Sequence, residues 1–381
     1  MRIRITPSPL AGVVQAPSSK SYTHRAIIIA SLAAGESIIE APLISDDVLY
    51  TIEACRFLGA DIEQTADTLK VRGTGGEIRA VSDKRQIYAG NSGSTIRMVA
   101  GVAALSQTKV ILDGDARLRL RPVGDLLSAL NSWGIQAQSL ANNGCPPIEI
   151  QGGSLTGGEV SVYGQESSQH VSSLLMIAPY ARNTVRIKVI DGLLSKPYVD
   201  MTLGIMRDFG VNVVNHDYKD FLVESGQTYH GRRYRVEGDY SSAAYLLAAG
   251  AIGGRPVSVC NLDASSLQGD RYLLTILSEM GCLVEYQKEQ VGISRHSDIK
   301  GITIDMGNYP DIVQTVAIIS AYARGRTKIT NIGHLKFKET NRIRDTATEL
   351  EKMGIRSEAT VDTITVYGGR PKGAEIDSHH D

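Results

Sequence analysis

Residues able to bind an anion gather at the beginning of the apolar stretch 26–34. Ser18 and Ser19 have side chains typical of helix N-caps and follow Pro17, so the stretch is expected to be a helix that begins beside them. A helix start offers unpaired backbone N–H groups and the positive end of the helix dipole, and Lys20 and Arg25 add two cations there. Ser21 and Arg25 are four residues apart and face the same side of the helix. The stretch indicates a phosphate or carboxylate site, with a capped and solvated surface helix as the alternative.

A glycine- and serine-rich loop and an arginine-rich segment extend this cationic character. The loop is residues 90–97, with Gly93 near its centre, and it lacks the glycine and lysine spacing of a nucleotide-binding P-loop. Arg117, Arg119 and Arg121 alternate along the chain, so an extended segment would place all three on one face. The planar fork of arginine suits a bidentate grip on carboxylate or phosphate. A solvated strand edge is the alternative for this segment.

Four later segments combine hydroxyl, amide and charged side chains at or near expected helix starts. They are Glu166-Ser167-Ser168-Gln169, Ser195-Lys196-Pro197-Tyr198, Pro310-Asp311-Ile312-Val313-Gln314 and Lys336-Phe337-Lys338-Glu339-Thr340-Asn341-Arg342. Asp311 and Gln314 also have the spacing of a capping box, and Glu339 and Arg342 that of an i, i+3 ion pair on a helix. Together the segments predict a cation-rich site with two carboxylates, suited to two anionic groups and to proton transfer.

An internal repeat orders the elements that must position these residues. Five glycines, each expected just past a helix end, are 75, 76, 71 and 73 residues apart: Gly59, Gly134, Gly210, Gly281 and Gly354. Five expected helix starts have a similar period, near Ser19, Gly93, Ser168, Ser242 and Asp311. We therefore expect five copies of an α/β unit of about 70 residues. Residues 1–18, which alternate from the first residue, are expected to form an opening strand pair that ends at Pro17. Residues 234–239 are expected to form a strand that leads into the fourth helix.

Composition bounds the class of protein. The chain has 381 residues, 42% of them hydrophobic, so it can form two or more domains. A net charge of −1 gives no support for a nucleic-acid partner, and the apolar runs are too short and interrupted for a membrane span. Four widely separated cysteines indicate neither a zinc site nor a disulfide framework. Without an N-terminal signal pattern, we expect a cytoplasmic protein.

The order and spacing of these segments point to a known family. The residues that carry the resemblance are Ser19-Lys20-Ser21 with Arg25, Gly90-Asn91-Ser92-Gly93-Ser94 with Arg97, Arg117 with Arg121-Pro122, Ser167-Ser168-Gln169, Ser195-Lys196-Pro197-Tyr198, Gly238-Asp239-Tyr240-Ser241-Ser242-Ala243, Pro310-Asp311 and Lys338-Glu339-Thr340-Asn341-Arg342. The chain resembles the 5-enolpyruvylshikimate-3-phosphate synthase family, the 3-phosphoshikimate 1-carboxyvinyltransferases, through all 381 residues.

The resemblance implies an α/β fold with two domains. Each would be an inside-out α/β barrel built of repeated βαβαββ units, with the active site in the interdomain cleft. The first, discontinuous domain would comprise residues 1–18 and 238–381, and the second residues 19–237. The resemblance also implies a monomer with no metal and no organic cofactor.

The resemblance assigns substrates and site residues as well. Shikimate 3-phosphate would contact Lys20, Ser21, Arg25, Ser167, Ser168, Gln169, Ser195, Tyr198, Asp311 and Lys338, and phosphoenolpyruvate would contact Lys20, Gly93, Arg117, Gln169, Glu339 and Arg342. The 5-hydroxyl of shikimate 3-phosphate would attack phosphoenolpyruvate, and the tetrahedral intermediate would lose phosphate. Asp311 would take the hydroxyl proton, and Glu339 or Lys20 would protonate the methylene carbon. This is a step of chorismate and aromatic amino-acid biosynthesis.

The chain also departs from the family pattern. Asn341 stands where Asp is usual and Ser94 where Thr is common. The pattern continues past Asp381 with a His-Arg pair and a Lys that complete the phosphoenolpyruvate site, so we expect a truncated chain whose first domain lacks its last strands and helix. Two alternatives are kept. One is a UDP-N-acetylglucosamine enolpyruvyl transferase, which has a cysteine in the loop that here is residues 114–119; the other is a non-catalytic phosphate-binding protein of the same fold.

Overall fold

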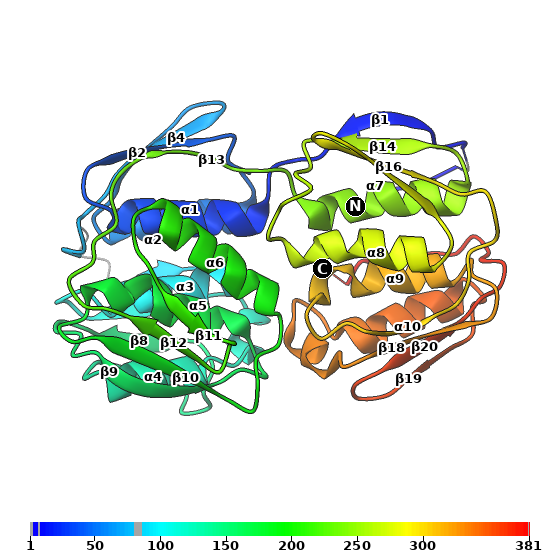
Figure 1. Cartoon of the computed structure of the whole chain (residues 1–381). Helices are drawn as coiled ribbons and strands as arrows, with labels where there is room; N and C mark the ends of the chain where they lie inside the picture. Colours follow the sequence, from blue (N-terminus) through cyan, green and yellow to red (C-terminus); the bar gives the residue numbers. More distant parts are fainter. Residues whose placement is uncertain (1–2, 7, 80–85, 380) are drawn as a thin grey trace. The chain divides into compact units, whose positions relative to one another are not determined.

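A computed structural model describes residues 3–6, 8–79, 86–379 and 381 (Figure 1). Contacts within the chain divide it into two compact units. We call residues 18–236 with 337–339 the three-sheet unit, and residues 1–17, 237–336 and 340–381 the two-sheet unit. The names reflect the four-stranded sheets found in the described residues of each.

The three-sheet unit contains three copies of one βαβαββ arrangement. The first copy comprises β13 (Arg233–Arg235), α1 (Lys20–Leu32), β2 (Glu36–Glu40), α2 (Asp46–Phe57), β3 (Asp61–Gln64) and β4 (Thr68–Arg72). The second comprises β5 (Gln86–Tyr88), α3 (Gly93–Ala103), β6 (Val110–Asp113), the 3-10 helix η1 (Leu118–Leu120), α4 (Gly124–Ser132), β7 (Gln136–Ser139) and β8 (Ile148–Gln151). The third comprises β9 (Gly158–Tyr163), α5 (Ser168–Ile177), η2 (Ala178–Tyr180), β10 (Val185–Ile190), α6 (Lys196–Asp208), β11 (Val214–His216) and β12 (Asp220–Val223).

The two-sheet unit contains two further copies. One comprises β1 (Gly12–Gln15), α7 (Tyr240–Gly253), β14 (Val257–Cys260), η3 (Gly269–Tyr272), α8 (Leu273–Glu279), β15 (Leu283–Gln287) and β16 (Gln290–Ser294). The other comprises β17 (Thr303–Asp305), η4 (Pro310–Ile312), α9 (Val313–Ser320), β18 (Arg326–Thr330), η5 (Gly333–Phe337), α10 (Arg342–Lys352), β19 (Ser357–Ala359) and β20 (Ile364–Tyr367).

All five sheets have the same topology. In the second copy the strand order is β5-β6-β8-β7, with β5 and β6 parallel and the remaining neighbours antiparallel. A parallel pair needs a long crossover, which α3 supplies, whereas the final antiparallel pair is joined by a short loop. The repeat expected from the five helix ends is therefore a structural repeat.

Two of the five copies take their first strand from a distant part of the chain. β13 pairs in parallel with β2, which lies almost two hundred residues earlier, and completes the first copy of the three-sheet unit. β1 pairs in parallel with β14, so that Gly12 faces Val257, and it completes the first copy of the two-sheet unit. Figure 1 shows β13 beside β2 and β1 beside β14. The N-terminal segment thus belongs to the unit that resumes at Glu237.

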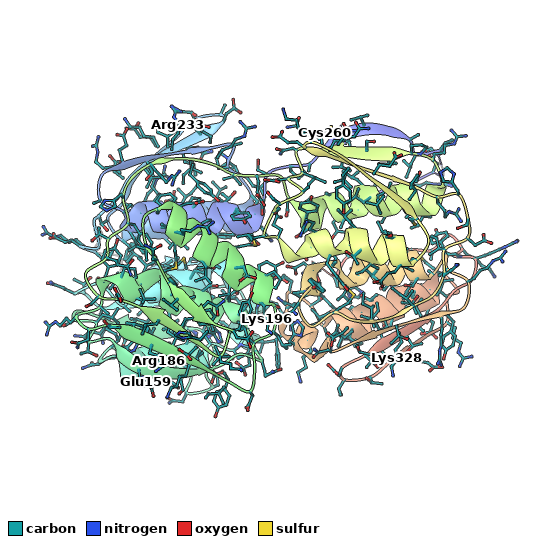
Figure 2. All side chains as sticks on the ribbon, viewed as in Figure 1. Glu159, Arg186, Lys196, Arg233, Cys260 and Lys328 are labelled. Carbon is teal, nitrogen blue, oxygen red and sulfur yellow. The ribbon has the colours of Figure 1, made fainter. Side chains whose placement is uncertain are left out.

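The helices of the three-sheet unit form its interior. In α1 every residue from Tyr22 to Leu32 is buried, and α3 and α5 are almost as completely enclosed. A helix that is buried on every side is stable only when neighbours surround it, which explains why the stretch 26–34 is almost entirely apolar. The outer face of the sheet carries charge: Glu159 on β9 and Arg186 on β10 are paired in register and both exposed (Figure 2).

The five predicted helix ends are confirmed. Each glycine of the series lies two residues beyond its helix and has a positive φ, from +75° at Gly354 to +104° at Gly59. After α2, for example, Gly59 N–H donates to the Arg56 carbonyl and Ala60 N–H to the Cys55 carbonyl. The same pair of hydrogen bonds follows α4, α6, α8 and α10. This is the Schellman motif, which needs a left-handed residue that glycine adopts at little cost.

The predicted helix starts are confirmed to within a few residues, but the structure corrects several local details. Side-chain caps come from Ser19, Ser92, Ser167, Asp239 and Asn341. Of the strand pair predicted at 1–18, one strand is confirmed as β1. Residues 3–6 join no strand, and residues 1, 2 and 7 lie outside the described residues. The predicted strand at 234–239 is shorter and begins earlier, as β13. Alternation alone was insufficient at both places because a strand also needs a partner.

Candidate active site

The anion-binding segment predicted at residues 19–25 lies at the start of α1. The Ser19 hydroxyl accepts a hydrogen bond from Tyr22 N–H at 3.4 Å, so Ser19, one of the two predicted capping residues, is the N-cap of α1. Lys20 is half-exposed, and its Nζ lies 3.3 Å from Asp47 Oδ2 on α2. The first turn of α1 therefore offers an accessible cation beside helix N–H groups, which is a favourable place for an anion.

Arg25 is not the surface residue that the solvated-helix alternative required. Its side chain is 1% exposed and connects α1 to α6. Nε donates to Thr202 Oγ1 at 2.8 Å, Nη1 to the Ser21 carbonyl at 2.9 Å, and Nη2 to the Tyr198 carbonyl at 3.0 Å. Burial lowers the pKa of Arg25 to about 10, which leaves the guanidinium charged at neutral pH. The structure brings Ser21, Arg25 and Tyr198 together.

The turn before α6 also holds Ser195. This residue is almost fully buried and has a left-handed backbone, with φ +54°. Its carbonyl accepts a hydrogen bond from Tyr198 N–H at 3.1 Å. Non-glycine residues rarely adopt this conformation, so the surrounding structure determines the position of Ser195.

Gln169 joins the starts of α3 and α5. Its Oε1 accepts from Arg97 Nη1 at 3.0 Å, and its Nε2 donates to Ser94 Oγ at 2.9 Å. Ser167 caps the helix by accepting from Gln169 N–H at 3.3 Å, and Ser168 is buried beside it. Burial and then repulsion from Arg121 lower the pKa of Arg97 to about 9, a value that still keeps Arg97 cationic at neutral pH.

The three alternating arginines occupy a turn, so the prediction of an extended segment was wrong. Leu118–Leu120 is a 3-10 helix, because Leu118 is fully buried and its N–H donates to Asp115 Oδ1 at 2.8 Å. The arginines consequently diverge. Arg119 donates to Asp113 and stays half-exposed, whereas Arg117 and Arg121 are directed to residues 338 and 339.

Arg117 and Arg121 hold the segment Phe337–Glu339, which the contacts assign to the three-sheet unit. Arg117 donates through Nη2 to the Lys338 carbonyl at 2.7 Å and through Nε to the Glu339 carbonyl at 2.8 Å. Arg121 is 3% exposed, and its Nη1 lies 3.1 Å from Glu339 Oε1. Its guanidinium also lies against Gly93, where a Cβ would come within 2.4 Å of Nη2. Gly93, Arg117, Lys338 and Glu339 are thus brought into one cluster.

In the two-sheet unit, Arg342 lies between two carboxylates. Its Nη1 lies 2.6 Å from Asp311 Oδ1, while Nε and Nη2 hold Asp381 at 2.7 and 2.8 Å. The predicted capping box is wrong, since the N-cap of α9 is Ile312 and has no side-chain cap hydrogen bond. The predicted i, i+3 pair on a helix is wrong too, because Glu339 precedes α10, which begins at Arg342. Asp311 and Arg342, the two predicted residues of this unit, are in direct contact.

A buried carboxyl group that the sequence did not single out lies near this pair. Asp270 of η3 is 3% exposed and accepts a hydrogen bond from the Ser241 hydroxyl. Burial, with the negative charge of Asp311 next in size, raises the pKa of Asp270 to about 8. Asp270 is consequently protonated across most of the neutral range. Sequence reasoning missed it because Gln268-Gly269-Asp270 has no spacing motif of its own.

Other residues of the site were missed for the same reason. Thr202 accepts from buried Arg25, from which it is separated by a long stretch of sequence. Arg97 was noted in the loop 90–97, but its hydrogen bond to the distant Gln169 was not predicted. Asp125, Glu166 and His170 form the group of potential metal ligands found in the described residues. Their proximity arises only from the fold.

Solved structures with a similar fold identify the class of α/β protein to which the chain belongs. The chain superimposes on the EPSP synthase from Acinetobacter baumannii with a TM-score of 0.80 at 27% identity, covering 98% of this chain and 87% of that chain. Another structure of EPSP synthase from Acinetobacter baumannii gives a TM-score of 0.78 at 26% identity. The mixed α/β architecture of repeated small sheets is therefore that of the EPSP synthase fold.

The sequence comparison identifies the family. The EPSP synthase (3-phosphoshikimate 1-carboxyvinyltransferase) family matches residues 5–381, and the chain belongs to it. The 3-phosphoshikimate 1-carboxyvinyltransferase of Methanococcoides burtonii is 42% identical over 384 residues, covering 100% of this chain and 89% of that relative. The enzyme of Methanobrevibacter smithii is 44% identical, covering 99% and 88%. In the described part of this chain, no helix combines the length and apolar character needed to cross a membrane.

Proposed function

We propose that the chain transfers the enolpyruvyl group of phosphoenolpyruvate to the 5-hydroxyl of shikimate 3-phosphate and releases phosphate. The observation that carries this proposal is membership of the 3-phosphoshikimate 1-carboxyvinyltransferase family over residues 5–381. The matching relatives described above carry the name of this enzyme, which favours it over a UDP-N-acetylglucosamine enolpyruvyl transferase. The activity is that of EC 2.5.1.19.

Two sets of residues are proposed to bind the two anionic substrates. For shikimate 3-phosphate they are Lys20, Ser21, Arg25, Ser167, Ser168, Gln169, Ser195, Tyr198, Asp311 and Lys338, and for phosphoenolpyruvate they are Lys20, Gly93, Arg117, Gln169, Glu339 and Arg342. The hydrogen bonds of the arginine side chains support the assignment of arginines to these sets. Arg25 is buried and held by Thr202, and Arg117 is held by the Lys338 and Glu339 carbonyls, so substrate binding requires little additional side-chain ordering.

The proposed reaction needs one proton acceptor and one proton donor. Asp311 takes the proton of the 5-hydroxyl as the oxygen attacks C2 of phosphoenolpyruvate, and Glu339 or Lys20 protonates the C3 methylene. Loss of a proton from that methyl group and departure of phosphate from C2 then regenerate the double bond. Asp311 accepts one hydrogen bond from Arg342 through Oδ1, and a carboxylate has further lone pairs for a hydroxyl proton.

The proposed site also bears on the domain organisation. We propose that the three-sheet unit and the two-sheet unit are the two domains of the enzyme, each an inside-out α/β barrel of βαβαββ copies. The buried helices of the three-sheet unit and the charged outer face of its sheets support this arrangement. Both units contribute proposed site residues, so the reaction depends on each of them.

Phosphate release tests the proposal. The 381-residue chain is given shikimate 3-phosphate and phosphoenolpyruvate, and the rate is compared with that of Asp311→Asn. Removing a general base typically costs about 10²–10⁴-fold in rate, so the variant should be nearly inactive. Asp298→Asn is the matched control, because Asp298 is an exposed residue of the same unit and pairs with Arg324. It should keep full activity.

Two outcomes would overturn the proposal. Binding of shikimate 3-phosphate without phosphate release would identify a non-catalytic anion-binding protein of this fold. Equal rates for the chain and Asp311→Asn would remove Asp311 from the reaction. Binding is measured separately by calorimetry with shikimate 3-phosphate alone, so that loss of catalysis is distinguished from loss of substrate binding.

A further inference from the structure

Three side chains from two segments of the three-sheet unit, the starts of α4 and α5, converge outside the residues assigned to the substrates. Asp125 is the second residue of α4, Glu166 directly precedes the N-cap of α5, and His170 is the third residue of α5. One ligand atom from each lies within 4.8 Å of the others. Carboxylate oxygens and an imidazole nitrogen are the ligands that first-row divalent cations bind in proteins.

The two buried ring nitrogens of His170 have no evident structural role. It is 0% exposed, and neither ring nitrogen makes a hydrogen bond of good geometry with the described part of the chain. The ring is enclosed by protein and lies with Asp125 and Glu166 in one cluster. A buried nitrogen without a partner costs free energy, and a bound ion or a water molecule removes that cost.

The second ring nitrogen has a suitable neighbour. The Pro122 carbonyl interacts with the His170 ring and favours its protonated form. A histidine that binds a metal commonly directs its other N–H at a backbone carbonyl, which fixes the orientation of the ring. The remaining nitrogen is then available to the two carboxylates and to a cation held by them.

The two carboxyl groups have no cationic side chain paired with them in the described residues. Within the described residues neither Asp125 nor Glu166 forms an ion pair, and both are only partly exposed. Asp125 lies in the first turn of α4, where the helix dipole favours a negative charge. That interaction accounts for Asp125 alone, but it does not explain why Glu166 and His170 face the same point.

We propose that Asp125, Glu166 and His170 bind one divalent cation of the zinc class. Ligand atoms about 2.0–2.2 Å from a tetrahedral ion are about 3.4 Å apart, so small rotations of the two carboxylates close the set. A nitrogen ligand favours Zn²⁺ or Co²⁺ over Mg²⁺ and Ca²⁺, which prefer oxygen. The cation joins the start of α4 to the start of α5.

This cation site is connected to Gln169 through one backbone carbonyl. Pro122 O, which interacts with His170, also accepts a hydrogen bond from Arg97 Nη2 at 3.2 Å. Arg97 in turn donates to Gln169 Oε1 at 3.0 Å. The Arg97 guanidinium is a positive charge close to the site.

Direct metal binding tests the inference on the full chain. The protein is treated with chelator, equilibrated with Zn²⁺ and dialysed, and its metal content is measured by mass spectrometry. We expect one equivalent of Zn²⁺ and a higher Tm in its presence. Co²⁺ in place of Zn²⁺ should give the absorption spectrum of a low-coordinate nitrogen and oxygen site, and excess Mg²⁺ should leave that spectrum unchanged.

Two variants and two controls make the result decisive. His170→Phe and Glu166→Gln should each weaken Zn²⁺ binding at least tenfold and remove the metal-dependent rise in Tm. His216→Phe is the matched control, because His216 forms an exposed pair with Asp220, and Cys145→Ser tests a nearby thiol. Both controls should bind Zn²⁺ as the parent does. Failure of the parent to bind Zn²⁺, or unchanged binding in both His170→Phe and Glu166→Gln, would overturn the inference.

Discussion

Gly93 and Arg121 share a space that no side chain at position 93 can enter without displacing the guanidinium. A Cβ on residue 93 would lie 2.4 Å from Nη2 and 2.6 Å from Cζ of Arg121. Arg121 uses the same guanidinium to bind Glu339 Oε1 at 3.1 Å and the Asn91 carbonyl at 3.0 Å. The absence of a side chain at Gly93 therefore sets the position of a buried cation and of its carboxylate partner.

Gly93→Ala should impair phosphoenolpyruvate binding by displacing Arg121. A hydrogen bond to a charged group contributes about 1.5–3 kcal/mol, so its loss predicts a KM for phosphoenolpyruvate that is higher by about tenfold or more. The KM for shikimate 3-phosphate should change less. Gly124→Ala is the matched control, since Gly124 is also the first residue of a helix and its Cβ would have no neighbour closer than 3.6 Å. Equal kinetic effects of the two substitutions would contradict this explanation.

Arg25→Lys should lower both stability and the affinity for shikimate 3-phosphate. Lysine keeps the charge but cannot reproduce three hydrogen bonds in fixed directions, so the Thr202 hydroxyl or the Tyr198 carbonyl loses its hydrogen bond from residue 25. A loss of about 2 kcal/mol in the free energy of unfolding is expected. Urea denaturation and the KM for shikimate 3-phosphate measure the two effects. Arg186→Lys, at an exposed ion pair with Asp220, should cost less than about 0.5 kcal/mol.

Asp270→Asn should change how stability depends on pH. The folded protein raises the pKa of Asp270 to about 8, whereas an unfolded aspartate titrates near about 3.9. Between these values the folded state holds one more proton than the unfolded state, so the contribution of Asp270 to the free energy of unfolding falls as pH rises. Asparagine does not titrate. The variant should therefore gain stability relative to the parent between about pH 5 and about pH 8, measured by urea denaturation at each pH. A constant difference across that range would contradict the assignment.

Gly281→Ala tests the helix ends that the repeat predicts. Gly281 has φ +96°, and an added Cβ would lie no closer than 3.6 Å to another group, the Ser297 Oγ. The substitution should therefore lower stability only through the backbone conformation. Left-handed conformations cost non-glycine residues about 1–2 kcal/mol, and the free energy of unfolding should fall by that amount. Gly373→Ala is the control, because no atom lies within 4 Å of its Cβ and its φ is not in the left-handed range. Similar losses of unfolding free energy in Gly281→Ala and Gly373→Ala would show that the left-handed conformation is not the cause.

The elements that could be predicted from sequence are those whose structure depends on local interactions. The glycines after α2 and α10, for instance, complete hydrogen bonds that span only a few residues. The arginine segment failed because alternation is compatible with more than one local structure. There, burial of Leu118 and the Asp115 cap favoured a turn.

The candidate site was predictable in its residue types but not in its pairings. Arg121 and Glu339 are 218 residues apart in the chain, and nothing in their local spacing relates them. The same holds for Arg25 with Thr202, which are 177 residues apart. Asp270 and His170 were missed because their significance depends on burial, which sequence spacing does not reveal.

The distant first strands, β1 and β13, have a consequence for biosynthesis. Gly12 leaves the ribosome early, yet its partner Val257 is translated more than two hundred residues later. At about 5–20 residues per second, β1 waits roughly 12–50 s before its sheet can form. The three-sheet unit likewise cannot close its first sheet until Arg233–Arg235 has been made. During that interval the nascent chain exposes the unpaired edges of β1 and β2, which makes it a substrate for chaperones that shield such edges.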